Sequence, residues 1–128
     1  MLDSHDGHEE DWVSDRFEDE RGVIQDLLAN IDMVTEIFTK KGAVRGNHVH
    51  KLTTQWAYVV SGRMLMASDN DGIVHQQSHG PGELIPELPG VAHAWKALED
   101  TTVLVFARGV RAGQDYEKDT YREGISLL

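Results

Sequence analysis

Residues 42–62 read GAVRGNHVHKLTTQWAYVVSG, and this stretch decides how the chain is interpreted. His48 and His50 are two positions apart, so on a β-strand both imidazoles lie on the same face. Gln55 follows five residues after His50 and reaches the same pocket only once the chain has turned into the next strand. Two imidazoles that point into a barrel are either metal ligands or a pair that transfers protons.

A third histidine comes from residues 82–93, which read GELIPELPGVAH. Pro89 and Gly90 predict a tight turn, because proline fixes its own φ and glycine accepts a positive φ. That turn presents His93 from a separate strand. The alternative interpretation treats the three histidines as buried polar groups that are held by hydrogen bonds.

From residue 31 onward the chain predicts short β-strands separated by turns. Expected strands cover residues 33–40, 55–60, 63–68, 73–78 and 101–107. Strands at this spacing are typical of a β-sandwich or barrel. Residues 69–72 (DNDG) predict a hairpin turn, and the apolar run 101–107 predicts a strand buried on both sides. No long helix is predicted, and residues 23–29 fit either a helical turn or a strand.

Composition limits the class of protein. The 128 residues include no cysteine, which excludes disulfide scaffolds, thiolate metal sites and cysteine nucleophiles. The formal net charge of −10 argues against a nucleic-acid binder, which needs a basic face. Nine acidic residues and one basic residue lie within residues 1–20, so the remaining chain is nearly balanced. We expect an acidic, partly flexible leader over residues 1–22 and one domain over residues 23–128.

The N-terminal residues have neither a basic start nor an apolar run, and no stretch of the sequence is apolar enough to span a membrane. We therefore expect a cytoplasmic protein. Arg45, Lys51 and Arg63 lie near the histidine motif in the sequence. We expect them to make the mouth of the pocket locally positive, so that a small anion is accepted despite the negative total.

The two motifs resemble those of small single-domain cupins (the cupin 2 type). The first cupin motif matches at Gly42, His48, His50 and Gly62, with Gln55 at the position that is usually acidic. The second motif matches at Gly82, Gly90 and His93, with Leu88 replacing a proline. The resemblance implies a β jelly roll whose bowl holds a divalent metal on His48, His50, Gln55 and His93. It leaves the metal open among Zn, Fe, Ni, Mn and Cu.

Residues 45–51 (RGNHVHK) with the following Gln55 are also similar to cupins that act on nucleotide-activated sugars, in particular the dTDP-4-keto-6-deoxyglucose 3,4-ketoisomerases. Moving a carbonyl between adjacent sugar carbons requires proton removal and return through an enediol, and histidine suits both steps. The resemblance implies His48 and His50 as the acid–base pair and Arg45 as a ligand for the diphosphate or an oxyanion. Further substrate contacts are expected from Lys51, Tyr58 and Trp95.

Each of these roles has a structural alternative. Arg45 fits a surface salt bridge equally well, and Tyr58 and Trp95 fit core positions, because aromatic side chains in strands are usually buried. Four functions stay open. They are a metal-binding cupin that isomerises or epimerises a nucleotide sugar, a metal-independent 3,4-ketoisomerase, an Fe(II) dioxygenase and a non-enzymatic ligand sensor. A homodimer is expected from the family resemblance alone.

Overall fold

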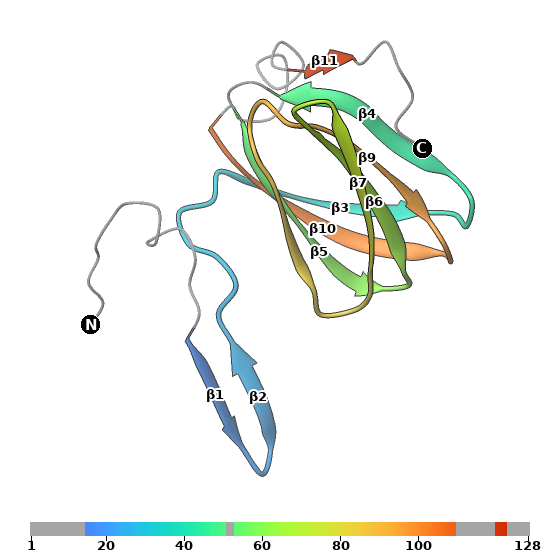
Figure 1. The fold of residues 1–128 in the computed structure, drawn as a ribbon. Helices are drawn as coiled ribbons and strands as arrows, with labels where there is room; N and C mark the ends of the chain where they lie inside the picture. Colours follow the sequence, from blue (N-terminus) through green and yellow to red (C-terminus); the bar gives the residue numbers. More distant parts are fainter. Residues whose placement is uncertain (1–14, 51–52, 110–119, 123–128) are drawn as a thin grey trace. The chain divides into compact units, whose positions relative to one another are not determined.

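The computed structural model describes residues 15–50, 53–109 and 120–122, and for residues 47–50 and 120–122 it describes the backbone only. All regular secondary structure in these residues is β-strand (Figure 1). The strands are β1 (Arg16–Asp19), β2 (Gly22–Gln25), β3 (Met33–Thr39), β4 (Val44–His50), β5 (Thr54–Ser61), β6 (Met64–Asn70), β7 (Ile73–His79), β8 (Leu84–Glu87), β9 (Ala92–Ala97), β10 (Thr101–Arg108) and β11 (Thr120–Arg122). The expected all-β class is confirmed.

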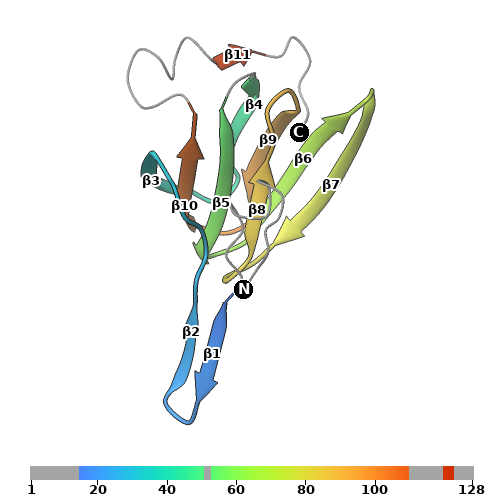
Figure 2. The same cartoon turned by 90° about the vertical axis from the view of Figure 1, so that its left-hand side faces the viewer.

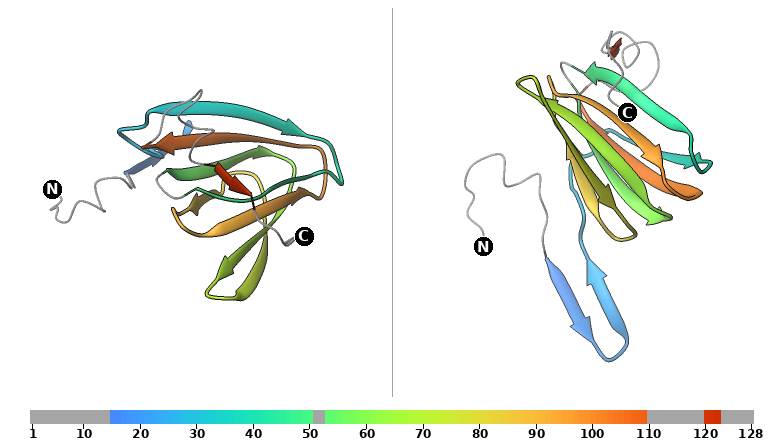
Figure 3. Two further views of the ribbon diagram at one scale, coloured as in Figure 1. Left: turned by 90° about the horizontal axis from the view of Figure 1, so that it is seen from above. Right: turned by 45° about the vertical axis from the view of Figure 1, so that its right-hand side comes forward.

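The described residues of the unit 32–128 form a sandwich of two antiparallel sheets. One sheet has the order β3-β10-β5-β8, and the other has the order β11-β4-β9-β6-β7. Consecutive strands β4 and β5 belong to different sheets, which is the connectivity of a jelly roll (Figure 2). Seen from above, β3 and the β6–β7 hairpin lie at opposite sides of the sandwich (Figure 3).

The core lies between the two sheets and follows from the alternation of side chains along each strand. Trp95 and Ala97 of β9, for example, point to the same face and pack with Val59 of β5. The cluster of buried residues consists of Ala57, Val59, Met64, Met66, Ile85, Trp95, Ala97 and Val103, with Ile37 and Val105 packed against it. Burying these side chains supplies the main stabilising term of the domain.

Turn residues fix the register of the hairpins. Asn70 pairs with Ile73, so Asp71 and Gly72 form a two-residue loop, and both have positive φ (55° and 85°). The turn expected over residues 69–72 is therefore confirmed. Pro89 and Gly90 connect β8 to β9, with Gly90 at φ 82°, as a turn with glycine at its third position requires.

The strand expected over residues 101–107, β10, is largely buried on one face and half-buried on the other. β10 is central in its sheet, between β3 and β5. Thr101, Val103 and Ala107 on its inner face are fully buried, whereas Leu104 and Phe106 on the outer face are half-buried. A sandwich has one covered face per sheet, so the apolar run signals a central strand here and not a doubly covered one.

Residues 1–31 belong to a separate unit, of which the structure describes residues 15–31. Its described part is a hairpin in which Phe17 of β1 pairs with Ile24 of β2, and both side chains are exposed. The stretch 23–29, which fits helix or strand in the sequence, begins as the strand Gly22–Gln25. The division between units lies after Ile31, whereas a boundary at residues 22/23 would cut this hairpin. Residues 1–14 of the expected leader lie outside the described residues.

No helix long and apolar enough to cross a membrane occurs among the residues that the structure describes.

Candidate functional site

Four strands from both sheets bring polar side chains to one internal cavity. Arg45 comes from β4, Gln55 from β5, Glu87 from β8 and His93 from β9. The cavity has a volume of about 230 Å³ and is lined by Ile37, Arg45, Gly46, Gln55, Glu87, His93, Trp95 and Val105. It therefore places a cation, an amide, a carboxylate and an imidazole around one space that fits a small polar group.

His93 and Glu87 form a buried pair within this cavity. The Nε2 of His93 lies 2.9 Å from the Oε1 of Glu87, and the two side chains are 6% and 7% exposed. The other ring nitrogen of His93, Nδ1, lies 3.2 Å from the carbonyl oxygen of Val91. Burial by itself lowers the pKa of His93, but the charge of Glu87 and these two hydrogen bonds outweigh it and raise the pKa above its ordinary value.

Gln55 and Glu87 are direct partners across the antiparallel pair β5–β8. The amide of Gln55, which is 5% exposed, thus faces the cavity beside the carboxylate of the next strand. Sequence reasoning missed Glu87. The signal was available, because Glu87 is two residues after the apolar Ile85 and therefore on the same inward face of β8.

Arg45 is held in place by uncharged groups of β3. Its Nε donates a hydrogen bond to Thr39 Oγ1 at 2.7 Å, and its Nη2 donates one to the carbonyl oxygen of Phe38 at 3.3 Å. No carboxylate pairs with this guanidinium among the residues that the structure describes. Its charge is therefore available to an anionic group in the cavity, and the alternative of a surface salt bridge finds no partner in that part of the chain.

Gly46 lets β4 approach β9 closely beside the cavity. Its φ is +97°, and a Cβ at this position would lie 2.9 Å from both the Cα of Ala94 and the carbonyl oxygen of His93. The pairing of β4 with β9 shifts in register between Gly46 and His48. A glycine at a bulge of this kind sets where the following residues of the strand lie relative to His93.

The histidines of the HxH motif are placed by their backbone only. His48 pairs with His93 across β4–β9, and His50 pairs with Thr120 across β4–β11. Their side chains lie outside the described residues, so their expected roles stay predictions. The expected substrate contact Lys51 also lies outside the described part of the chain.

Of the other residues expected to contact the substrate, one lines the cavity and one does not. Trp95 lines the cavity and is 6% exposed, so it serves the core and the site together. Tyr58 is three residues after Gln55 on β5, hence on the opposite face of the sheet, and does not line the cavity. Arg63 was expected to belong to a positive cluster at the mouth of the pocket. It instead follows the far end of β5 and binds Ser78, so it does not line the cavity.

The described donor atoms of the cavity do not by themselves form a metal centre. Gln55, Glu87 and His93 supply an amide, a carboxylate and an imidazole, but both nitrogens of His93 already have partners in Glu87 and Val91. No group of three or more His, Asp or Glu side chains suited to a metal ion occurs among the described residues. These side chains alone do not fit a metal ion, which would need His48 and His50 as well.

Comparisons with known proteins agree with this architecture. The sequence matches the cupin family model over residues 26–116. It is 31% identical over 87 residues to an oxalate decarboxylase of Arthroderma benhamiae, a match that covers 66% of this chain and 20% of that protein. The chain thus spans about a fifth of the length of this curated relative.

Two solved structures show the same fold. The sugar 3,4-ketoisomerase QdtA of Thermoanaerobacterium thermosaccharolyticum, in complex with TDP, superposes with a TM-score of 0.72 at 18% identity, over 88% of this chain and 86% of that one. The dTDP-4-dehydrorhamnose 3,5-epimerase of Sulfolobus tokodaii has a TM-score of 0.62 at 23% identity, over 79% and 70% of the two chains.

Proposed function

Since the chain belongs to the cupin family, we propose that it binds a nucleotide-linked sugar in the cavity between its sheets and moves a proton between adjacent carbons of that sugar. The observation that carries the proposal is the buried Glu87–His93 pair, which opens on the same cavity as Arg45. Support from outside the chain comes from the fold, which it shares with a TDP-bound sugar ketoisomerase and a sugar epimerase.

In this reaction Glu87 is the group that takes the proton. His93 occupies its Oε1 through Nε2, so the second carboxylate oxygen is the one that acts on the substrate. A carboxylate that is fixed in position beside the substrate is a suitable general base for a proton on carbon. After the transfer, the same oxygen returns the proton to the neighbouring carbon of the substrate.

Arg45 serves the negative charge of the substrate. The proton that leaves the carbon next to a carbonyl generates an enediolate, and a fixed guanidinium stabilises such an oxyanion or the diphosphate. His48 and His50, which the resemblance implies as the acid–base pair, stay candidates for the second acid–base group. An amide at position 55, beside Glu87, donates a hydrogen bond to a sugar oxygen without adding charge.

The test is proton exchange on a candidate substrate. In deuterium oxide, we expect the protein to introduce deuterium at the carbon next to the carbonyl of dTDP-4-keto-6-deoxyglucose and to form the 3-keto isomer. NMR spectra of the sugar measure both changes. Replacement Glu87→Gln should slow exchange by about 10²–10⁴-fold, the usual contribution of a general base. Glu83→Gln is the matched control, because Glu83 also binds a histidine but does not line the cavity. Absence of exchange at high protein concentration would overturn the proposal.

A metal centre is the second candidate. It rests on the HxH motif and on the backbone pairing of His48 with His93. The metal would be held by His48, His50, Gln55 and His93 and would polarise a substrate carbonyl. We expect about one ion per chain, lost in His48→Ala, in protein purified without added metal. This candidate would be removed if the purified protein contained no metal and a chelator left its stability unchanged.

The remaining alternatives differ in one readout each. An Fe(II) dioxygenase needs the same metal centre and consumes oxygen when substrate is added. A ligand sensor binds TDP-sugar without proton exchange. The expected homodimer stays a prediction, which sedimentation equilibrium tests directly.

A further inference from the structure

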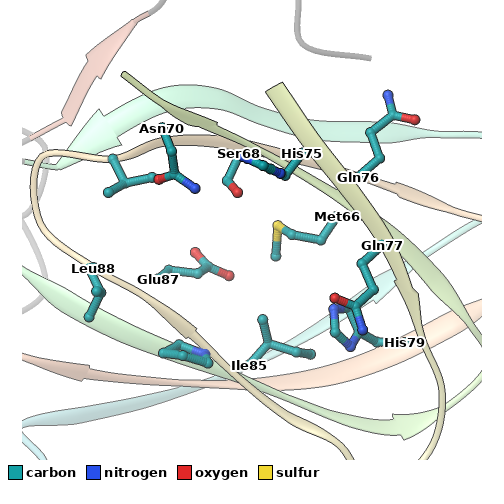
Figure 4. Close-up of a pocket in the computed structure, with 12 residues that line it drawn as sticks. Met66, Ser68, Asn70, His75, Gln76, Gln77, His79, Ile85, Glu87 and Leu88 are labelled. Atoms are coloured by element: carbon teal, nitrogen blue, oxygen red, sulfur yellow. The ribbon is translucent and has the colours of Figure 1, made fainter. Parts of the chain in front are cut away.

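A second hollow lies beside the cavity, between the edge strands of the two sheets (Figure 4). β7 and β8 form its sides and β6 its floor. Its volume is about 460 Å³, within the range of sites for small molecules. We call it the β6–β8 groove, lined by Met66, Ser68, Asn70, His75, Gln76, Gln77, His79, Ile85, Pro86, Glu87, Leu88 and Val91.

The groove combines neutral polar groups with apolar surface. Ser68, Asn70, His75 and Gln77 can each donate and accept hydrogen bonds, and within the described residues none of their side chains makes one. Met66, Ile85 and Leu88 supply apolar surface in the same hollow (Figure 4). None of the described lining residues is lysine or arginine, so the groove lacks the charge that a phosphate needs.

Glu87 connects the groove to the cavity, because it lines both. The strand order β4-β9-β6-β7 then places three kinds of chemistry in sequence across the sheet. Arg45 lies on β4, His93 on β9 and the neutral groups on β6 and β7. A substrate that directs its anionic part to Arg45 therefore directs its opposite end toward the groove.

From this arrangement we propose that the β6–β8 groove is a carbohydrate subsite, which binds an uncharged, hydroxylated sugar ring next to Glu87. Hydroxyl groups of such a ring find donors and acceptors in Ser68, Asn70, His75 and Gln77, and its C–H faces find Met66 and Ile85. The proposal rests on the proposed function for the position of the reacting sugar, but binding to the groove requires no chemistry and is measured separately.

The experiment uses the full chain and two probes, methyl β-D-glucopyranoside for the groove and TDP for the cavity, each followed by amide NMR spectra. We expect saturable shifts from the glucoside at β6 and β7 and from TDP around Arg45. Gln77→Leu should weaken glucoside binding by about fivefold, as for the loss of one hydrogen bond between neutral groups. Gln25→Leu is the matched control, because Gln25 lines neither the groove nor the cavity, and it should leave affinity unchanged.

Each outcome decides a separate point. TDP binding without glucoside binding overturns the subsite and leaves the proposed function standing. Glucoside binding without TDP binding supports the subsite and contradicts the nucleotide part of the proposed function. Equal binding of cyclohexanol, which offers the ring with a single hydroxyl, would show that the groove recognises only apolar surface and would overturn the subsite. Equal weakening by both leucine variants would do the same.

Discussion

Gln55 and Glu87 stand directly opposite each other on β5 and β8, so the carboxylate that the first cupin motif lacks at position 55 is supplied from the neighbouring strand. The substitution in the motif therefore does not remove negative charge from the cavity. The carboxylate of the cavity belongs to Glu87, whose Oε1 lies 2.9 Å from the Nε2 of His93. The acidic group of this site belongs to the strand that precedes the Pro-Gly turn.

The first prediction concerns the charge of His93. In Glu87→Gln the imidazole loses its Coulombic partner but keeps its burial, so its pKa should fall below the ordinary value of 6.5. NMR titration of the imidazole measures this directly. The same change at Glu83, which binds His79 at the surface, should leave the pKa of His93 where it was. An unchanged His93 pKa in Glu87→Gln would contradict the pairing.

A second prediction follows for stability against pH. Because the folded-state pKa of His93 is raised, the pair contributes stability that is fully present below about pH 6.5 and lost as the pH rises through the folded pKa. In Glu87→Gln the sign reverses, since a lowered pKa makes stability increase as the pH rises. Urea unfolding of both proteins between about pH 5.5 and 8.5 separates the two slopes. Parallel curves would refute the argument.

Glu83 does not disturb that measurement. The hydrogen bond from the Gly80 amide, and then the one with His79, lower the pKa of Glu83. Its contribution is therefore present above about pH 4.5 and is lost only as the pH falls through a still lower value. The window of His93 begins at about pH 6.5 and therefore lies above this acid limb.

Much of the fold could be predicted from the sequence because its signals are local. Asp71 and Gly72 specify a two-residue turn through their φ angles. The motif led us to expect Gln55 in the pocket, and Trp95 was expected as a substrate contact or a core residue; both line the cavity. Motif spacing located β4, β5 and β9 around one space without any knowledge of the register between them.

What sequence reasoning missed depends on register between strands distant in the chain. Glu87 becomes important only because β8 pairs with β5 and faces His93. Thr39 likewise matters only because β3 brings its hydroxyl to Arg45. Proximity in sequence also suggested that Arg63 joins the site, whereas the length of β5 separates it from Gln55. Pairings of this kind are non-local and leave no periodic signal.

A third prediction tests how Arg45 is positioned. Thr39 is 1% exposed and accepts a hydrogen bond from Arg45 Nε at 2.7 Å. Thr39→Val keeps the shape of the side chain but removes this acceptor, so the guanidinium is held less firmly. We expect weaker TDP binding by about fivefold to tenfold, which corresponds to a typical net hydrogen-bond contribution of about 1 kcal/mol. Arg45→Gln should weaken it further. Calorimetric titration measures both.

Arg63→Gln is the control for that series, since Arg63 binds Ser78 and lies outside the cavity. It removes the same charge from the protein, so it reports the general electrostatic effect on an anionic ligand. If Arg45→Gln and Arg63→Gln weaken TDP binding equally, then Arg45 acts through net charge and has no direct contact with the ligand.

The last prediction concerns the close approach of β4 to β9. In Gly46→Ala the new Cβ would meet the backbone of Ala94 and the carbonyl oxygen of His93, each at 2.9 Å, so one strand must move. Gly72→Ala introduces a Cβ at a similar φ of +85° with nothing within 4 Å, so it isolates the cost of the backbone conformation. We expect that cost to be about 1–2 kcal/mol in both proteins, with a further 1–3 kcal/mol, roughly, from overpacking only in Gly46→Ala. Chemical denaturation measures the difference, and the displaced strand should also shift the imidazole resonances of His93. Equal destabilisation by the two variants would mean that the contact between β4 and β9 is not tight.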